Sequence, residues 1–302
     1  MFKFQRTLNK KIKFSGIGLH TGSTTNMIVY PAEKDSGIIF KRTDLYNGVT
    51  VKALVENVVE TNRGTTIGIG HDKIHTIEHF LSALNGIGID NAYIEIDNIE
   101  PPIFDGSSKE FISRILDVGI KKYESERKFI IISKPIEYSN NHCNIKILPC
   151  EEFKVTYYGN FTYGNIGKQE YIYSSNTDYI KEISFARTFC SIGELIYLKE
   201  NGLIQGADLN SGIVFLDKKI SKDDIKTILS KINLKVESLN VSNNTLNNVA
   251  LRYENEPIRH KILDLVGDFS LLGCDLKGHV ISNGGGHASN IEIMRKIVTI
   301  YA

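Results

Sequence analysis

Strand-like and helix-like segments follow one another in the same order twice along this 302-residue chain. In the first round, β-like runs at Thr24 to Tyr30 and Gly37 to Lys41 come before the helix-like segments. The alternating run Asn91 to Asp97 is typical of a half-buried strand. After the charged octet Lys121 to Lys128, strand-like runs again precede helix-like ones. Strands followed by helices within each half predict an α+β fold of sheet and helix layers.

The charged octet is the best candidate for a domain boundary. A chain of this length commonly divides into two units of roughly 150 residues. We therefore expect an N-terminal α+β domain of residues 1–125 and a C-terminal α+β domain of residues 126–302. The two halves share negligible sequence identity, so the order of their elements alone suggests a structural duplication.

The composition excludes several classes of protein. With 41% hydrophobic and 24% charged residues, the chain resembles an ordinary globular protein and not a low-complexity or disordered one. A net charge of +1 argues against nucleic acid as the main partner. No run approaches the ~20 apolar residues that span a bilayer, the N-terminus does not resemble a signal peptide, and the four cysteines lack Cys-x-x-Cys spacing. We expect a cytoplasmic protein with no transmembrane segment.

The segment His75 to Asn85 predicts an amphipathic helix. At ~100° per residue, its apolar side chains form one continuous face. The side chains of His75, His79 and Ser82 lie opposite that face, and Glu78 lies on its flank. Because the apolar face accounts for the core without the histidines, this segment alone indicates a solvated polar face.

A second segment, Pro257 to Leu272, repeats the pattern. Its apolar positions again form one face, and His260, Asp264 and Asp268 lie opposite. His260 and Asp264 are i, i+4 neighbours on a helix, so both side chains can reach one cation. Gly267 removes a side chain that could block close approach. A wet helix face with a weak ion pair is the alternative.

Two such helices favour a joint explanation. Imidazole nitrogens together with one carboxylate oxygen make an open catalytic zinc site. His79 from the first helix, with His260 and Asp264 from the second, would supply this set. Glu78 is adjacent to a ligand but ~100° around the helix, where it can accept a proton from water.

A competing motif overlaps the first helix. The run His75 to His79 matches His-x-x-Glu-His, the inverted zinc metallopeptidase signature. In that signature His75 and His79 bind the metal, and Glu78 is the base. The motif leaves the polar face of the second helix unexplained, and spacing alone leaves the metallopeptidase open as an alternative function.

Several separated motifs resemble those of one known family. The motifs are SGIGLHTG (15–22), TIEHFLSALNGIGIDN (76–91), PIFDGS (102–107), ARTF (186–189), RHKILDLVGD (259–268) and GHASN (286–290). In this order, and over essentially the whole chain, they resemble the UDP-3-O-acyl-N-acetylglucosamine deacetylases, zinc enzymes of the committed step of lipid A synthesis. The resemblance implies two similarly built α/β-layered domains with the active site between them. It also implies hydrolysis of the substrate's acetamido group, with release of acetate.

The resemblance implies a role for each matching residue. His79, His260 and Asp264 would be the metal ligands and Glu78 the general base. The general acid would be His287.

The matches also imply the residues around this centre. Asp268 would hold the general acid, and Thr188 would stabilise the oxyanion. Lys261 would meet the substrate diphosphate, and Phe189 would line the substrate site. An apolar channel for the acyl chain is implied, for which Ile192 to Leu198 offers suitable side chains.

The implied cofactor is Zn²⁺, and Fe²⁺ also suits such ligands. The implied partner is a small-molecule substrate, the acylated UDP-glucosamine; we expect no nucleic acid, and a monomer. Two residues depart from the family pattern, since Cys190 stands where glycine commonly follows Phe189, and His75 is not a usual family residue. A non-catalytic sugar-nucleotide-binding protein that reuses the fold is a further alternative.

Overall fold

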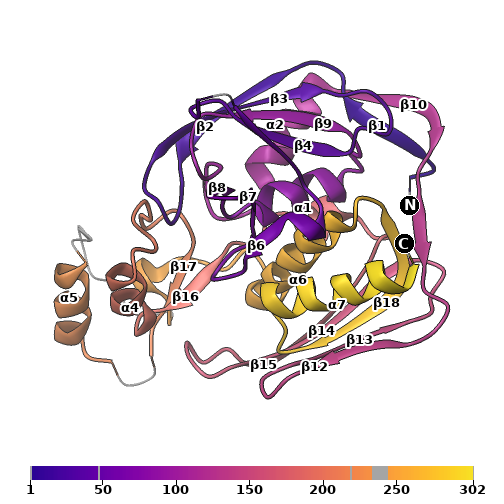
Figure 1. The fold of residues 1–302 in the computed structure, drawn as a ribbon. Coiled ribbons are helices and arrows are strands. Elements are labelled where there is room, and N and C mark those ends of the chain that lie inside the picture. Colours follow the sequence, from indigo (N-terminus) through magenta and orange to yellow (C-terminus); the bar gives the residue numbers. More distant parts are fainter. Residues whose placement is uncertain (1, 47, 218–219, 233–243, 302) are drawn as a thin grey trace.

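Two β-sheets form the outer layers of the molecule, and long helices lie between them (Figure 1). The structure, a computed structural model, describes residues 2–46, 48–217, 220–232 and 244–301. A smaller part of the chain projects from one side of these layers, and the two chain ends lie near each other on the opposite side. The layered arrangement of sheets and helices confirms the expected α+β class.

The first sheet is built from the N-terminal part of the chain. In spatial order its strands are β2 (Ile12–Ile17), β3 (Thr24–Pro31), β9 (Ala92–Ile96), β4 (Ile38–Arg42) and β5 (Val49–Lys52). The central strand β9 pairs antiparallel with β3 and parallel with β4. Ala92, Ile94 and Ile96 are buried and the residues between them are half-buried, as the alternating sequence predicts.

The second sheet is built from the C-terminal part. In spatial order its strands are β12 (Ile136–Ser139), β13 (Asn144–Leu148), β18 (Asp275–Asn283), β14 (Phe153–Phe161) and β15 (Gly167–Ser174), and β11 (Phe129–Ile131) also pairs with β18. The central strand β18 is antiparallel to β13 and parallel to β14.

The two sheets share one topology. In each, a first hairpin (β2–β3 or β12–β13) and a second hairpin (β4–β5 or β14–β15) are separated by a central strand that comes last in the chain. The duplication that the order of the elements suggested is therefore present in the strand order. The division of the chain at residues 125 and 126 stays a prediction.

The charged octet at the expected boundary belongs to a strand. Strand β10 (Ile120–Glu126) pairs antiparallel with β1 (Phe4–Leu8). The next residue, Arg127, has a buried side chain, and its guanidinium forms ion pairs of 2.6 Å with Asp90 and of 2.6 Å with Asp275. A carboxylate from each part of the chain thus holds this arginine, which ties the two parts together.

Two of the helices between the sheets, α1 (Glu78–Gly86) and α6 (Glu256–Phe269), carry the predicted polar faces. With them lie α2 (Lys109–Val118) and α7 (His287–Tyr301). The apolar face of α1 packs on the first sheet, where Phe80 contacts the rings of Phe14 and Phe40. The polar face of α1 packs on the polar face of α6, and a Cβ atom at Gly267 would overlap with the carbonyl oxygen of Glu78.

The interpretation of these polar faces as solvated is therefore wrong. His79, Ser82, His260 and Asp264 are all at most 5% exposed. A helical wheel identifies the apolar face but cannot show that the opposite face is covered by another helix. Glycine at position 267 allows the two helix backbones to approach closely enough to exclude water.

The part that projects sideways, here called the insert, comprises residues 189–217 and 220–232. It contains β16 (Phe189–Ser191), α4 (Glu194–Glu200), β17 (Ile213–Phe215) and α5 (Lys222–Lys231). Strands β16 and β17 are parallel. Its buried apolar side chains form a cluster separate from the main core, namely Ile192, Leu195, Leu216, Ile225, Leu229 and Ile232, joined by Leu246.

The remaining elements are short. They are β6 (Val58–Glu60), β7 (Thr66–Ile69), β8 (Asp72–Ile74), α3 (Tyr179–Glu182) and the 3₁₀ helices η1 (Val55–Asn57), η2 (Leu246–Asn248) and η3 (Ser270–Leu272). Strands β6, β7 and β8 form a small antiparallel sheet that leads into α1. Within the described ranges, no helix combines the length and the hydropathy that crossing a membrane requires.

Candidate active site

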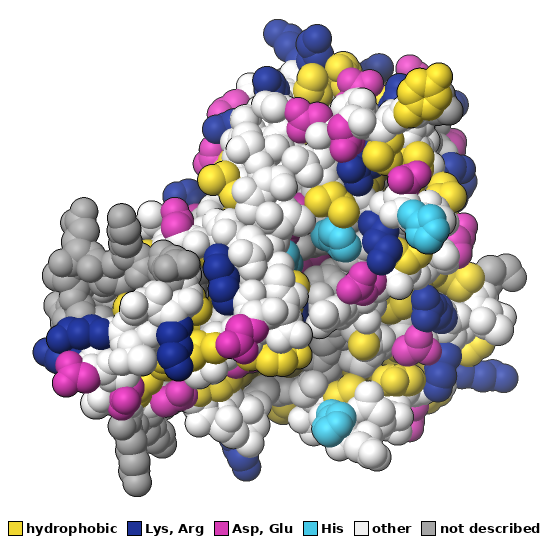
Figure 2. Space-filling view, turned by 60° about the vertical axis from the view of Figure 1, so that its left-hand side comes forward, with side chains coloured by type: hydrophobic (Ala, Val, Ile, Leu, Met, Phe, Trp, Pro, Cys, Tyr) yellow, Lys and Arg dark blue, Asp and Glu magenta, His cyan; other side chains and the backbone are white. Residues whose placement is uncertain are grey.

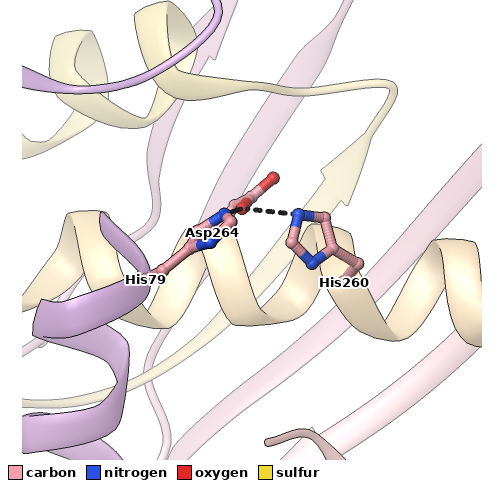
Figure 3. A group of neighbouring side chains, drawn as sticks. All are labelled: His79, His260 and Asp264. Atoms are coloured by element: carbon pink, nitrogen blue, oxygen red, sulfur yellow. Dashed lines mark ion pairs between the residues drawn. The ribbon is translucent and has the colours of Figure 1, made fainter. Parts of the chain in front are cut away.

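Three predicted metal ligands converge where α1 crosses α6. His79 comes from the first turn of α1, and His260 and Asp264 come from successive turns of α6 (Figure 3). The Asp264 Oδ1 atom lies 3.6 Å from His79 Nε2 and 3.2 Å from His260 Nε2. One ligand atom of each residue lies within 4.8 Å of the others. Among the residues that the structure describes, no other group of His, Cys, Asp and Glu meets this criterion.

The protonation of these side chains suits a cation. His260 Nδ1 donates a hydrogen bond to the carbonyl oxygen of Ala186 at 3.1 Å, so Nε2 of the neutral ring presents a lone pair. Burial lowers the pKa of His260 to about 3, which keeps the ring neutral. Two hydrogen-bond acceptors, His260 Nε2 and Asp264 Oδ1, thus face each other. A divalent ion between them would remove their repulsion, so the donor set fits a metal.

Lys261 stands beside the same carboxylate. Its Nζ donates to Asp264 Oδ2 at 2.9 Å and lies 5.7 Å from the centroid of the Phe189 ring. Burial alone would raise the pKa of Asp264, but the ammonium group of Lys261 holds it well below the usual range. Asp264 therefore stays ionised, with Oδ1 directed to the histidines and Oδ2 to the lysine.

Glu78 lies next to the ligand group in a dry environment. It is the first residue of α1, only 2% exposed, and its Oε2 accepts the backbone N–H of Thr65 at 2.9 Å. Burial raises the pKa of Glu78 above that of an exposed carboxyl. The carboxylate is therefore a stronger base than an exposed one.

His287 is held by a carboxylate at the start of α7. Its Nδ1 donates to Asp268 Oδ2 at 2.9 Å, and the same oxygen accepts Asn290 Nδ2 at 2.8 Å. Burial alone would lower the pKa of His287, but Asp268 and Glu78 raise it to about 10. The preceding turn is fixed, because the hydroxyl of Tyr157 donates to the carbonyl oxygen of Gly285. His287 is thus a positioned imidazolium at neutral pH.

A cavity of about 280 Å³ joins these groups to the insert. Its polar lining includes Glu78, His79, Thr188, His260, Lys261, Asp264 and His287. Its apolar lining from the insert includes Phe189, Leu195, Leu198, Ile204, Ile213 and Val214. Figure 2 shows histidine side chains on the hollowed surface beside the insert. Asp268 does not line the cavity and is fully buried, so it can influence the cavity through its hydrogen bond to His287.

The PIFDGS motif fixes the position of Thr188. The backbone N–H of Thr188 donates to the carbonyl oxygen of Gly106 at 2.8 Å, and its carbonyl oxygen accepts the N–H of Ile213 at 2.9 Å. In the same motif, the carboxylate of Asp105 forms an ion pair of 2.8 Å with Arg252 and accepts a hydrogen bond from the backbone N–H of Ser107. The motif therefore supports the wall of the cavity without entering it.

His75 lies away from the ligand group. It precedes α1, because the helix begins at Glu78, three residues later than the start of the predicted segment His75 to Asn85. Thr76 has a positive φ of 51°, so the backbone changes direction between His75 and the start of the helix. The Nδ1 of His75 lies 2.8 Å from the hydroxyl of Thr66. The inverted motif therefore does not place two histidines on one helix face.

Two residues of the site were given no role from the sequence, although His20 lies within the motif SGIGLHTG. His20, at the tip of the β2–β3 hairpin, lines the cavity, and its Nδ1 accepts the N–H of Ile204 at 3.3 Å. Thr65 is fully buried behind Glu78 and contacts Asp268. Both stand in connections between strands, where no periodic pattern distinguishes them.

The chain matches one protein family over nearly its full length. The model of a family described as "UDP-3-O-acyl N-acetylglycosamine deacetylase" matches residues 5–228 and 234–299. A "UDP-3-O-acyl-N-acetylglucosamine deacetylase" of Syntrophotalea carbinolica is 39% identical over 98% of this chain and 88% of its own length. One of the same name from Acidithiobacillus ferrooxidans is 36% identical, over 97% and 90%. A "Bifunctional enzyme LpxC/FabZ" of Chlorobaculum tepidum is 38% identical over 98% of this chain, which spans 64% of that longer protein.

Proposed function

The chain belongs to the UDP-3-O-acyl-N-acetylglucosamine deacetylase family, and from this premise we propose how its residues carry out the reaction. The protein is a hydrolytic deacetylase of lipid A synthesis that acts on a small-molecule substrate. The bond cleaved is the amide of the 2-acetamido group, so the products are acetate and the free amine of the sugar. One observation carries the proposal: a His₂Asp group, a buried glutamate and a charged histidine line one cavity.

His79, His260 and Asp264 hold one divalent ion in this proposal. Imidazole and carboxylate ligands suit Zn²⁺, and also Fe²⁺. When bound, the ion supplies Lewis acidity that polarises the amide carbonyl and makes water nucleophilic at neutral pH. Its support is the convergence of three ligand atoms, together with the hydrogen bond of His260 Nδ1 to Ala186, which leaves Nε2 of His260 free to bind the ion.

Glu78 and His287 move the protons. Glu78 accepts a proton from the attacking water, and the N–H of Thr65 orients its carboxylate. His287 then donates a proton to the departing nitrogen as the C–N bond breaks. Asp268 keeps His287 charged and aimed at the cavity. The base comes from α1 and the acid from α7, and Thr65 contacts both.

The remaining residues bind the substrate. Thr188, fixed by Gly106, stabilises the oxyanion of the tetrahedral intermediate. Phe189 lines the substrate site, and Lys261 meets the diphosphate. The acyl chain lies along the apolar lining from the insert. Of the segment Ile192 to Leu198, Leu195 and Leu198 line the cavity and Ile192 belongs to the core of the insert.

The proposal extends to the setting of the enzyme. A UDP-sugar substrate and the lack of a membrane-crossing helix in the described ranges support a cytoplasmic enzyme. We propose that it acts as a monomer, because the ligands and both proton-transfer groups come from one chain. The domains are proposed to be residues 1–125 and 126–302.

Metal analysis combined with an acetate-release assay tests the function. Purified protein is expected to contain one equivalent of Zn²⁺ or Fe²⁺ and to release acetate from UDP-3-O-acyl-N-acetylglucosamine. A chelator should abolish the release, and added Zn²⁺ should restore it. Protein that binds the UDP-sugar but holds no stoichiometric metal and releases no acetate would instead be a non-catalytic binding protein.

The rate is expected to depend on pH as a bell-shaped curve. Activity needs Glu78 ionised and His287 protonated. Burial raises the pKa of Glu78, so the acid limb should lie above the ~4.3 of an exposed glutamate. The pKa of His287 is raised to about 10, so activity should persist through neutral pH and fall as the pH rises through that value. The measurement is kcat/KM against pH, and an alkaline limb near ~6.5, the usual histidine value, would contradict the role of Asp268.

A further inference from the structure

Thr65 lies between the two groups that move protons. It stands at the end of the connection between β6 and β7, and its side chain is fully buried. Its neighbours in space are Glu78 of α1 and Asp268 of α6, which are 190 residues apart in the chain. Thr65 forms a hydrogen bond with each of these two carboxylates.

The backbone and the side chain of Thr65 each hold one of these carboxylates. The N–H of Thr65 donates to Glu78 Oε2 at 2.9 Å. The hydroxyl of Thr65 donates to Asp268 Oδ1 at 2.6 Å, and it lies 3.3 Å from His287 Nδ1. Hydrogen bonds to an ionised partner are the strong ones, so both contacts fix geometry as well as charge.

The hydroxyl completes the set of donors around Asp268. Its Oδ2 accepts His287 and Asn290, and its Oδ1 accepts Thr65. Asp268 is fully buried, so without the hydroxyl its Oδ1 would lose this donor in a dry environment. The carboxylate could then rotate about the Cβ–Cγ bond of Asp268, and the direction in which it holds the imidazolium would be lost.

Thr65 itself is held firmly. Its carbonyl oxygen accepts the N–H of Ile77 at 3.2 Å, one residue before Glu78. The next residue, Thr66, begins strand β7, which pairs with β6 and β8. A residue fixed on both sides in this way can transmit position between α1 and α6.

We propose that Thr65 is a positioning residue of the deacetylation reaction, which sets Glu78 and the Asp268–His287 pair at a fixed separation. The inference rests on the proposed function, because it assumes that Glu78 accepts and His287 donates the proton. Thr65 acts through these groups and does not touch the reacting atoms. A substitution can remove the hydrogen bond from its hydroxyl to Asp268, whereas the hydrogen bond from its backbone N–H to Glu78 remains.

Thr65→Val removes the hydroxyl and nearly keeps the shape of the side chain. We expect kcat to fall about 10- to 100-fold, the scale of one hydrogen bond to a buried charge, while KM and the metal content stay unchanged. Thr65→Ser restores the hydroxyl and should return kcat to within about threefold of the wild type. If the valine variant does not fold, Thr65→Ala replaces it in the same comparison.

Thr66→Val is the matched control. It removes a buried threonine hydroxyl from the adjacent residue, and that hydroxyl contacts His75 Nδ1 at 2.8 Å instead of Asp268. The loss of a hydrogen bond is thus comparable, but the proton-transfer groups keep their partners. We expect kcat of this variant to stay within about threefold of the wild type.

A double-mutant cycle with Asp268→Ala shows whether Thr65 acts through Asp268. In that background Thr65→Val should lower kcat no further. A Thr65→Val enzyme with wild-type kcat, or an equal further fall in the Asp268→Ala background, overturns the inference. If Glu78→Gln and His287→Ala are inactive in the same assay, either of these two outcomes refutes only the role of Thr65 and leaves the proposed function standing. If those two variants are fully active, the proposed function itself fails.

Discussion

Replacing Glu78 by glutamine is expected to lower kcat about 100- to 10,000-fold, the contribution of a positioned proton acceptor. Glutamine has the same shape and can still accept the N–H of Thr65, but it cannot take a proton from water. The metal content should stay at one equivalent, because Glu78 is not one of the converging ligands. The measurements are acetate release and elemental analysis on the same preparation.

His287→Ala should lower turnover in the same way, again with the metal retained. Glu110→Gln is a suitable control, since this glutamate lies on the exposed side of α2 in an i, i+4 ion pair with Arg114. A near-normal rate for Glu78→Gln would refute the assigned role of the base. The same result for His287→Ala would refute the role of the acid.

Replacing His260 by alanine is expected to abolish both metal binding and acetate release. The substitution leaves His79 and Asp264 as a pair, and the two remaining donors no longer enclose an ion. His75→Ala should keep the metal and the activity, because His75 stands outside the ligand group and contacts Thr66. The inverted-motif metallopeptidase predicts the opposite outcome for both variants.

Folding must be controlled in this comparison, because His260 is buried and its Nδ1 bonds to Ala186. His260→Gln keeps part of the side-chain volume and gives a second test of the same ligand. Thermal unfolding of both variants without metal should stay close to that of the metal-free wild type. Full metal content in a folded His260→Ala protein would exclude the proposed ligand set.

Part of the site followed from local sequence pattern alone. The i, i+4 spacing of His260 and Asp264 on a predicted helix placed these ligands on one face, and the structure bears this out. That His79 meets them could not follow from periodicity, since it depends on how two distant helices pack. The joint explanation of the two polar faces proposed that link and the resemblance to a family supported it, whereas the pairing of Asp268 with His287 came from the resemblance alone.

Other features could not be read from the sequence because they depend on what covers a surface. The polar faces of α1 and α6 look solvated on a helical wheel but are buried against each other at Gly267. Thr65 and His20 lie in connections between strands, where a single polar residue has no periodic signature. The charged octet suggested a boundary, yet most of it forms strand β10 beside β1.

The separate apolar core of the insert has a consequence for how enzymes of this design can diverge. One wall of the proposed acyl channel is supported by Ile192, Ile225 and Leu229, and the helices that carry the proposed ligands are supported by a different set of side chains. Substitutions that lengthen, shorten or reshape the channel therefore need not disturb the ligands. Preference for one fatty-acid length can drift from species to species while the catalytic chemistry stays the same.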